Sequence, residues 1–118
     1  MGERELGRRA SVGGAPAGAV LAALDFAGEV WHWRGPAPFY FVTVPEEESE
    51  VVHEVRHLVT YGWGMVPLEA RIGRTTWTTS LFPKDGLYVL PLKDAVRRAE
   101  EIDQGDLIDV SVVLRERC

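Results

Sequence analysis

A short basic segment is the most promising place for chemistry in this sequence. Residues 70–84 carry three cations and no acidic residue, and the same stretch holds five hydroxyl side chains. Guanidinium forks and hydroxyl groups are donors that proteins use to bind phosphate and carboxylate groups. The segment therefore predicts a site for a small anionic ligand. Its expected residues are Arg71, Arg74, Thr76, Thr78, Ser80 and Lys84, with Lys93 and Arg97 from a following helix nearby.

The same segment also has a purely structural interpretation. Threonine favours strands because its branched side chain packs well on a pleated surface. Lysine and arginine on a strand edge discourage pairing with another chain. The residue types alone leave both interpretations open.

Two tryptophans form a second candidate surface. Trp31 and Trp33 alternate with Val30 and His32 along a predicted strand, and successive side chains of a strand point to opposite faces. Both indoles are therefore expected to point away from the core, whereas Trp77 is expected inside it. An outward indole pair either packs under a helix or belongs to a surface that binds a ligand or partner.

Patterns typical of metal sites are weak. His53 and His57 lie four residues apart in a predicted helix, a spacing that places two metal ligands on one face. That face lies opposite the apolar side of the helix, and no further ligand motif accompanies it. We expect two solvated histidines and no metal. The acidic run at 46–50 suits the positive end of the helix dipole.

Patterns typical of catalysis are equally weak. Ser80 has neither the flanking glycines of a nucleophile elbow nor an assigned base. Cys118 is the single cysteine and the last residue, so it can form no internal disulfide and has no held base beside it. We expect no cofactor and rank an enzyme last among the candidate functions.

Composition and charge narrow the class of protein. The 118 residues, 46% of them hydrophobic, suit one folded domain at 21–118 behind a flexible tail at 1–20. No apolar run has the length of a membrane span, so we expect a soluble, cytoplasmic protein. Of the net charge of −5, the tail carries +1 from three arginines and two glutamates, which leaves −6 on the domain. An acidic domain repels phosphate backbones, which argues against nucleic acid as a partner.

Apolar periodicity predicts a mainly β chain with two helices. Alternation predicts strands at 24–32, 39–44, 66–72, 75–82, 87–90 and 108–114, with Gly28 as a bulge in the first. Gly73 and Arg74 predict a hairpin turn. One helix is expected to begin at Pro45 and end at 61–64. A second is expected to begin at Pro91, with a buried stripe of Leu92, Ala95, Val96, Ala99 and Ile102.

The predicted elements repeat once along the chain. A strand, a proline, an amphipathic helix, a glycine turn and a strand follow one another at 42–66, and the same order recurs at 89–107. One such unit cannot bury its helix stripe and strand face alone. Two units related by a pseudo-twofold axis could bury them together.

Several motifs together resemble one family, the domain of unknown function numbered 1905. The matching segments are 28–31, 35–45, 62–64, 70–73, 77–83, 88–93, 95–99 and 105–106. The resemblance covers about residues 24–114 and implies a double-split β-barrel capped by helices, of the kind found in small bacterial proteins. The second unit also resembles half of an AbrB- or MazE-type barrel, which assembles from two chains and binds DNA. With both units on one chain, we expect the barrel to close within a monomer.

The functional hypotheses follow in order. The first is a non-enzymatic module that uses the basic, threonine-rich hairpin to hold a small anionic ligand or a protein partner. The second is a DNA-binding regulator of the AbrB type, which rests on likeness of fold alone. The third is an enzyme of unknown reaction. The resemblance supplies no catalytic residues for it.

Overall fold

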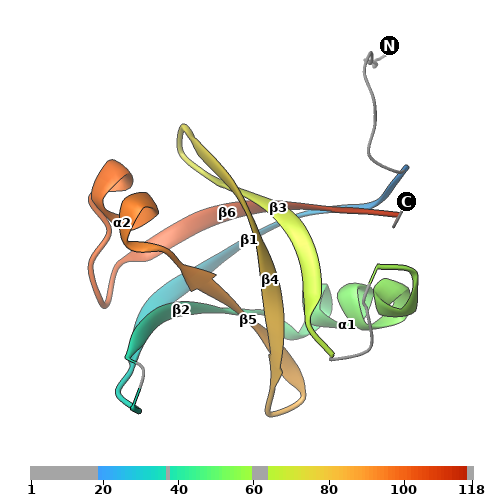
Figure 1. Cartoon of the computed structure of the whole chain (residues 1–118), viewed down its shortest axis with the longest axis horizontal. Helices are drawn as coiled ribbons and strands as arrows, with labels where there is room; N and C mark the ends of the chain where they lie inside the picture. The colour runs from blue at the N-terminus through green and yellow to red at the C-terminus, as the bar shows by residue number, and fades with distance from the viewer. Residues whose placement is uncertain (1–18, 37, 60–63, 117–118) are drawn as a thin grey trace.

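The computed structural model describes residues 19–36, 38–59 and 64–116, which form a closed barrel of antiparallel strands with helices at its two ends (Figure 1). Around the barrel the strand order is β1-β2-β5-β4-β3-β6. The elements are β1 (Val20–Trp33), β2 (Phe39–Val44), α1 (Glu46–Val55), the 3-10 turn η1 (Arg56–Leu58), β3 (Val66–Ile72), β4 (Thr75–Lys84), β5 (Leu87–Leu92), α2 (Asp94–Glu100) and β6 (Leu107–Arg115). The predicted mainly β barrel with two helices is confirmed.

Two long strands change partner midway and thereby divide the barrel. β1 pairs with β6 as far as Glu29 and with β2 from Val30 onward. β4 pairs with β3 as far as Leu81 and with β5 from Phe82 onward. The barrel therefore consists of two sheets, β1-β6-β3-β4 and β1-β2-β5-β4, that share β1 and β4. This is the predicted double split.

The two halves of the chain repeat the same order of elements. β1-β2-α1-β3 is followed by β4-β5-α2-β6. β2 pairs antiparallel with its counterpart β5, and β3 pairs with its counterpart β6. Both pairings cross between the halves, as a pseudo-twofold axis requires, so neither half closes the barrel alone.

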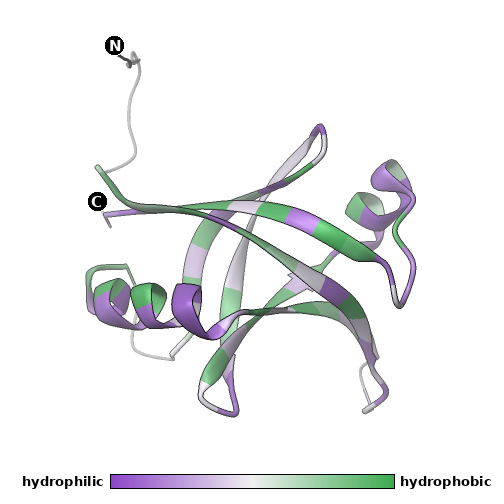
Figure 2. Ribbon diagram, turned by 180° about the vertical axis from the view of Figure 1, so that it is seen from behind, coloured by the Kyte–Doolittle hydropathy of each residue, from purple (hydrophilic) through white to green (hydrophobic). Residues whose placement is uncertain are grey.

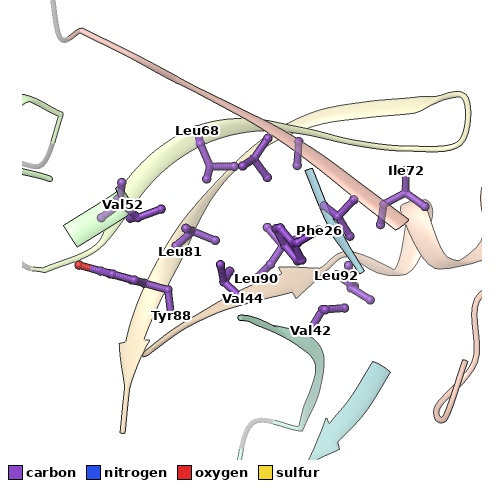
Figure 3. Close-up of a cluster of buried hydrophobic side chains, with 14 of the residues drawn as sticks. Phe26, Val42, Val44, Val52, Leu68, Ile72, Leu81, Tyr88, Leu90 and Leu92 are labelled. Carbon is purple, nitrogen blue, oxygen red and sulfur yellow. The ribbon is translucent and has the colours of Figure 1, made fainter. Parts of the chain in front are cut away.

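The core lies inside the barrel and follows the alternation of the strands. Val66, Leu68, Ala70 and Ile72 of β3 are all buried, as their spacing predicts. Figure 2 shows hydrophobic and hydrophilic residues alternating along the long strands. Figure 3 shows side chains of five strands converging, with Val52 of α1 at one end of the cluster. The strands thus bury one face each, and their other faces form the outer surface.

The start of the second helix was predicted wrongly. Pro91 lies buried in β5, and α2 begins three residues later at Asp94. The pairing of β5 with β4 ends at Val89, so a proline at 91 removes no bond from that ladder. Ala95 and Ala99 are exposed, whereas Val96 and Ile102 are buried. The buried stripe is narrower than expected because α2 has only seven residues, and Glu101, the residue after its last turn, has a left-handed backbone.

Gly28 is not a bulge, contrary to expectation. It pairs with Ile108 within a continuous register. A Cβ at this position would lie 2.6 Å from Cγ1 of Val42, so the glycine is required by the close approach of a core side chain from the neighbouring strand.

The first helix also differs in its ends. Pro45 is the residue before α1, which ends at Val55, where η1 follows. His53 and His57 therefore belong to different kinds of helical turn. The predicted helix end at 61–64 falls mainly on residues outside the described part, as does most of the predicted tail at 1–20.

A buried serine that the sequence did not single out joins α1 to the barrel. The Ser49 hydroxyl donates to the carbonyl of Val44 at 2.9 Å and accepts the backbone N–H of Tyr88 at 3.2 Å. Burial in turn raises the pKa of the Tyr88 phenol, and the Arg56 charge offsets part of that rise. A buried hydroxyl with both partners present stabilises this corner of the fold.

The β3–β4 hairpin is anchored at its tip to α2. Gly73 has a φ of 59°, a conformation that glycine adopts without strain. The Glu100 carboxylate accepts the Arg74 backbone N–H at 3.2 Å and the Thr75 hydroxyl at 2.6 Å. The hairpin turn is therefore held in place by Glu100 of α2.

Trp77 lies on the inner face of β4 and packs against the core, but it is half-buried rather than fully buried. Trp77→Ala should lower the unfolding free energy by about 2–3 kcal/mol, less than the ~3–5 kcal/mol typical of a fully buried aromatic. His53→Ala, on the exposed side of α1, should change it by less than about 0.5 kcal/mol. Urea melts of both variants test the contrast. A Trp77→Ala protein as stable as the parent would contradict the packing described for β4.

Gly73→Ala should destabilise the protein for two reasons. The left-handed backbone costs a residue with a Cβ about 1–2 kcal/mol, and the new Cβ would collide with the Glu100 carboxylate. Gly86→Ala is the matched control, since Gly86 has a φ of 80° but its Cβ would meet no atom within 4 Å. Thermal melts should therefore show a larger loss for Gly73→Ala. Equal losses would mean that the Glu100 anchor contributes nothing.

Candidate functional site

The two sheets present outer faces of different chemistry. We call the outer face of β1-β2-β5-β4 around Trp31, Trp33, Phe39, Phe41 and Phe82 the aromatic face. We call the outer face of β1-β6-β3-β4 around Asp25, Ser111, Arg71 and Thr76 the polar face. Because β1 and β4 belong to both sheets, each contributes residues to both faces.

Four of the five rings of the aromatic face form a connected cluster centred on Phe41. The ring of Phe41 lies 5.2 Å from that of Trp31 and 6.5 Å from that of Phe82, measured between centroids, and the ring of Phe39 lies 5.7 Å from it. These separations are within the range in which aromatic pairs attract. Phe41 thus joins β1 and β4 across the sheet.

Two contacts hold the tryptophans of this face. The Trp31 indole N–H donates to the Thr43 hydroxyl at 3.0 Å, which satisfies its polar atom and orients the ring. The Lys84 ammonium lies 5.6 Å from the centroid of Trp33, a cation–π contact. Trp33 remains 44% exposed and Phe82 40%. Both tryptophans alternate with the buried Val30 and so lie on the outer side of β1.

The polar face contains a row with one side chain from each strand. Asp25 pairs with Ser111, Ser111 with Arg71, and Arg71 with Thr76. The Ser111 hydroxyl donates to the Asp25 carboxylate at 2.6 Å. On the adjacent row, the Glu69 carboxylate forms an ion pair with Arg115 at 3.7 Å.

An open cavity of about 470 Å³ lies over this row. Its lining includes Asp25, Glu69, Arg71, Thr76, Ser111 and Val113. The structure therefore brings Arg71 and Thr76 of the predicted hairpin together, but it places two carboxylates beside them. The sequence did not indicate those carboxylates, because they come from β1 and from the residue preceding the basic segment.

The other predicted site residues are dispersed. Thr78 and Ser80 lie on the outer side of β4 between the two faces, and Arg74 lies at the hairpin tip. Lys84 belongs to the aromatic face and also pairs with Asp85 at 3.3 Å. Lys93 is exposed just before α2. The hairpin is thus not one continuous basic surface.

The Arg97 guanidinium already contacts neighbouring side chains of this domain. Its guanidinium carbon lies 3.6 Å from the centroid of the Tyr40 ring, and its nitrogens lie 3.6 Å from the Asp94 carboxylate and 3.7 Å from that of Asp103. Stacking on Tyr40 holds α2 against β2, whereas the two ion pairs link Arg97 to α2 itself and to the segment that follows it. This arrangement indicates a structural role for Arg97.

The outer side of α1 is acidic. Glu46, Glu50, Glu54 and Asp85 line an open cavity of about 790 Å³ together with His53. Within the described residues, no three His, Cys, Asp or Glu side chains are grouped so that they could hold a metal ion. In the same part of the chain, no helix combines the length and apolar character needed to cross a membrane.

Comparison with known proteins gives a family and no function. The model of the domain of unknown function DUF1905 matches residues 26–112, a span that begins within β1, ends within β6 and includes both halves of the barrel. No curated protein matches the chain. The match includes every residue of the aromatic face and, of the polar row, all but Asp25. Because the family model covers most of the chain, this chain is a member of the DUF1905 family.

Proposed function

We propose that this domain is a non-enzymatic binding module that docks a protein partner on the aromatic face. The observation that supports the proposal is a group of five aromatic side chains on one outer sheet surface. Four of them are in ring contact through Phe41, and two, Trp33 and Phe82, are at least 40% exposed. Tryptophan is prominent among residues that dominate binding energy, and exposed apolar clusters mark interaction sites.

The aromatic face is suited to binding because its rings extend from regular strands and one indole is held by a hydrogen bond. Its aromatics extend from regular strands, and the bond from Trp31 to Thr43 holds one indole in place. At Trp31 a partner would therefore have less side-chain entropy to remove on binding. Aromatic rings and one ammonium provide contact area and a charge, which suits docking better than proton or group transfer.

Charge favours a protein over a nucleic acid on this face. The part of the chain from residue 21 onward carries −6, and Lys84 is the cation placed on the aromatic face. Nucleic-acid binding depends on several cations facing the phosphates. Lys84 is moreover already paired with Asp85, so a protein partner with an apolar contact surface fits the face better than a polyanion does.

The test is a paired capture experiment followed by a titration. The double variant Trp33→Ser/Phe82→Ser removes the two most exposed rings, whereas Arg71→Ala changes the polar face and serves as the matched control. A partner captured from cell extract by the parent and by Arg71→Ala should be lost with the double variant. In calorimetry with the purified partner, the double variant should bind at least about 30-fold more weakly, corresponding to ~2 kcal/mol for a dominant contact.

Both variants alter side chains that are partly or fully exposed, so near-parental melting curves are required before the comparison is made. A partner that binds the double variant as tightly as the parent would exclude the aromatic face as its docking surface. A partner lost with Arg71→Ala instead would move the docking surface to the polar face.

A further inference from the structure

We propose that the polar face is a second, independent site, which takes a small zwitterion such as a free α-amino acid. The site is the cavity over the row Asp25, Ser111, Arg71 and Thr76. It shares no residue with the aromatic face and does not depend on the function proposed for that face.

The register gives the row a fixed order of charge. Neighbouring strands lie about 4.8 Å apart, so the row runs from a carboxylate on β1, through a hydroxyl on β6, to a guanidinium on β3 and a hydroxyl on β4. The acidic end and the basic end are thus about 10 Å apart at the backbone. Their side chains face one cavity.

The neighbouring ion pairs identify which charges a ligand would meet. Glu69 is paired with Arg115, so its charge is already compensated. Within residues 19–36, 38–59 and 64–116, neither Asp25 nor Arg71 forms an ion pair, and they do not form one with each other. Asp25 instead accepts the Ser111 hydroxyl. One open negative charge and one open positive charge therefore face the same cavity.

This pairing of charges selects the class of ligand. A simple anion bound at Arg71 would be repelled by Asp25, and a simple cation at Asp25 would be repelled by Arg71. A molecule with an ammonium and a carboxylate can place each group beside the opposite charge, and Thr76 can donate a further hydrogen bond to the carboxylate. Val113 offers apolar contact to a ligand side chain.

The volume is consistent with a small ligand, and the openness of the site implies weak binding. About 470 Å³ falls within the range of small-molecule sites, roughly 300–1,000 Å³. Solvent screens exposed ion pairs, so each contributes little. We therefore expect a dissociation constant on the order of 1 mM.

The experiment is a titration followed by ¹H–¹⁵N NMR on the full chain. L-Valine is the probe, isobutyrate lacks the ammonium group, and isobutylamine lacks the carboxylate. L-Valine up to about 20 mM should give saturable shifts at the amides of Arg71 and Ser111, whereas each half-molecule should bind at least about tenfold more weakly. Inorganic phosphate is included because the basic hairpin alone would favour it.

Variants test the roles of the two charged residues of the site, Arg71 and Asp25. Arg71→Gln and Asp25→Asn should each weaken L-valine binding by at least about tenfold, and their spectra show directly whether the fold is kept. Asp25→Asn should at the same time strengthen isobutyrate or phosphate binding, because the repelling charge is gone. His53→Ala on α1 and the aromatic-face variant Trp33→Ser/Phe82→Ser should leave L-valine binding unchanged.

Each other outcome overturns the proposal. Isobutyrate or phosphate binding as tightly as L-valine would make this an anion site, and isobutylamine binding as tightly would make it a cation site. No saturable shift with L-valine would mean that the cavity is only the uneven surface of the sheet. None of these results bears on the function proposed for the aromatic face, which is tested only by the partner-binding experiment.

Discussion

The pairing of each half of the chain with the other is the constraint on which the remaining structure depends. The barrel closes, and its inner faces meet, only when β2 pairs with β5 and β3 pairs with β6. At the centres of these pairings, Val42 lies opposite Leu90 and Ala70 opposite Val112, and all four residues are buried. A single half would leave its apolar strand face and two strand edges in water.

The partner exchange of β1 and β4 gives the molecule its two outer faces. A strand that belongs to two sheets carries its outward side chains first onto one surface and then onto the other. Asp25 and Trp31 both point outward from β1, but they lie on either side of the exchange at Val30. Thr76 and Phe82 are related in the same way on β4. The exchange therefore separates polar from aromatic residues without any break in the chain.

The pseudo-twofold symmetry extends to the elements but not to the outer side chains. The row on the polar face has a carboxylate from β1 and a serine from β6, but an arginine from β3 and a threonine from β4. Core positions must be apolar and complementary in volume because both halves fill one interior at close packing. Outer positions carry no such demand, so they can diverge and acquire binding chemistry.

The strands, their inner faces and the repeat were readable from the residues alone. Alternation in 66–72 and 108–114 has a period of two because one face of each strand is buried, and the structure keeps that period throughout. The outward position of Trp31 and Trp33 follows from the same rule. The helix start was placed wrongly at Pro91. A proline suits the first turn of a helix, but it also suits a strand position whose backbone nitrogen has no neighbouring strand to bond.

The sites were determined by tertiary pairing. The basic hairpin contains no acidic residue in sequence. In the barrel, however, β6 pairs with both β1 and β3, so Asp25 lies in the same row as Arg71, two strands away. Phe41 and Phe82 join the tryptophans only because β2 and β4 flank β5. A sequence specifies which face of a strand each side chain occupies, since the side-chain period is local. Which strands lie side by side depends on long-range closure of the barrel, and that closure decides which charges and rings meet.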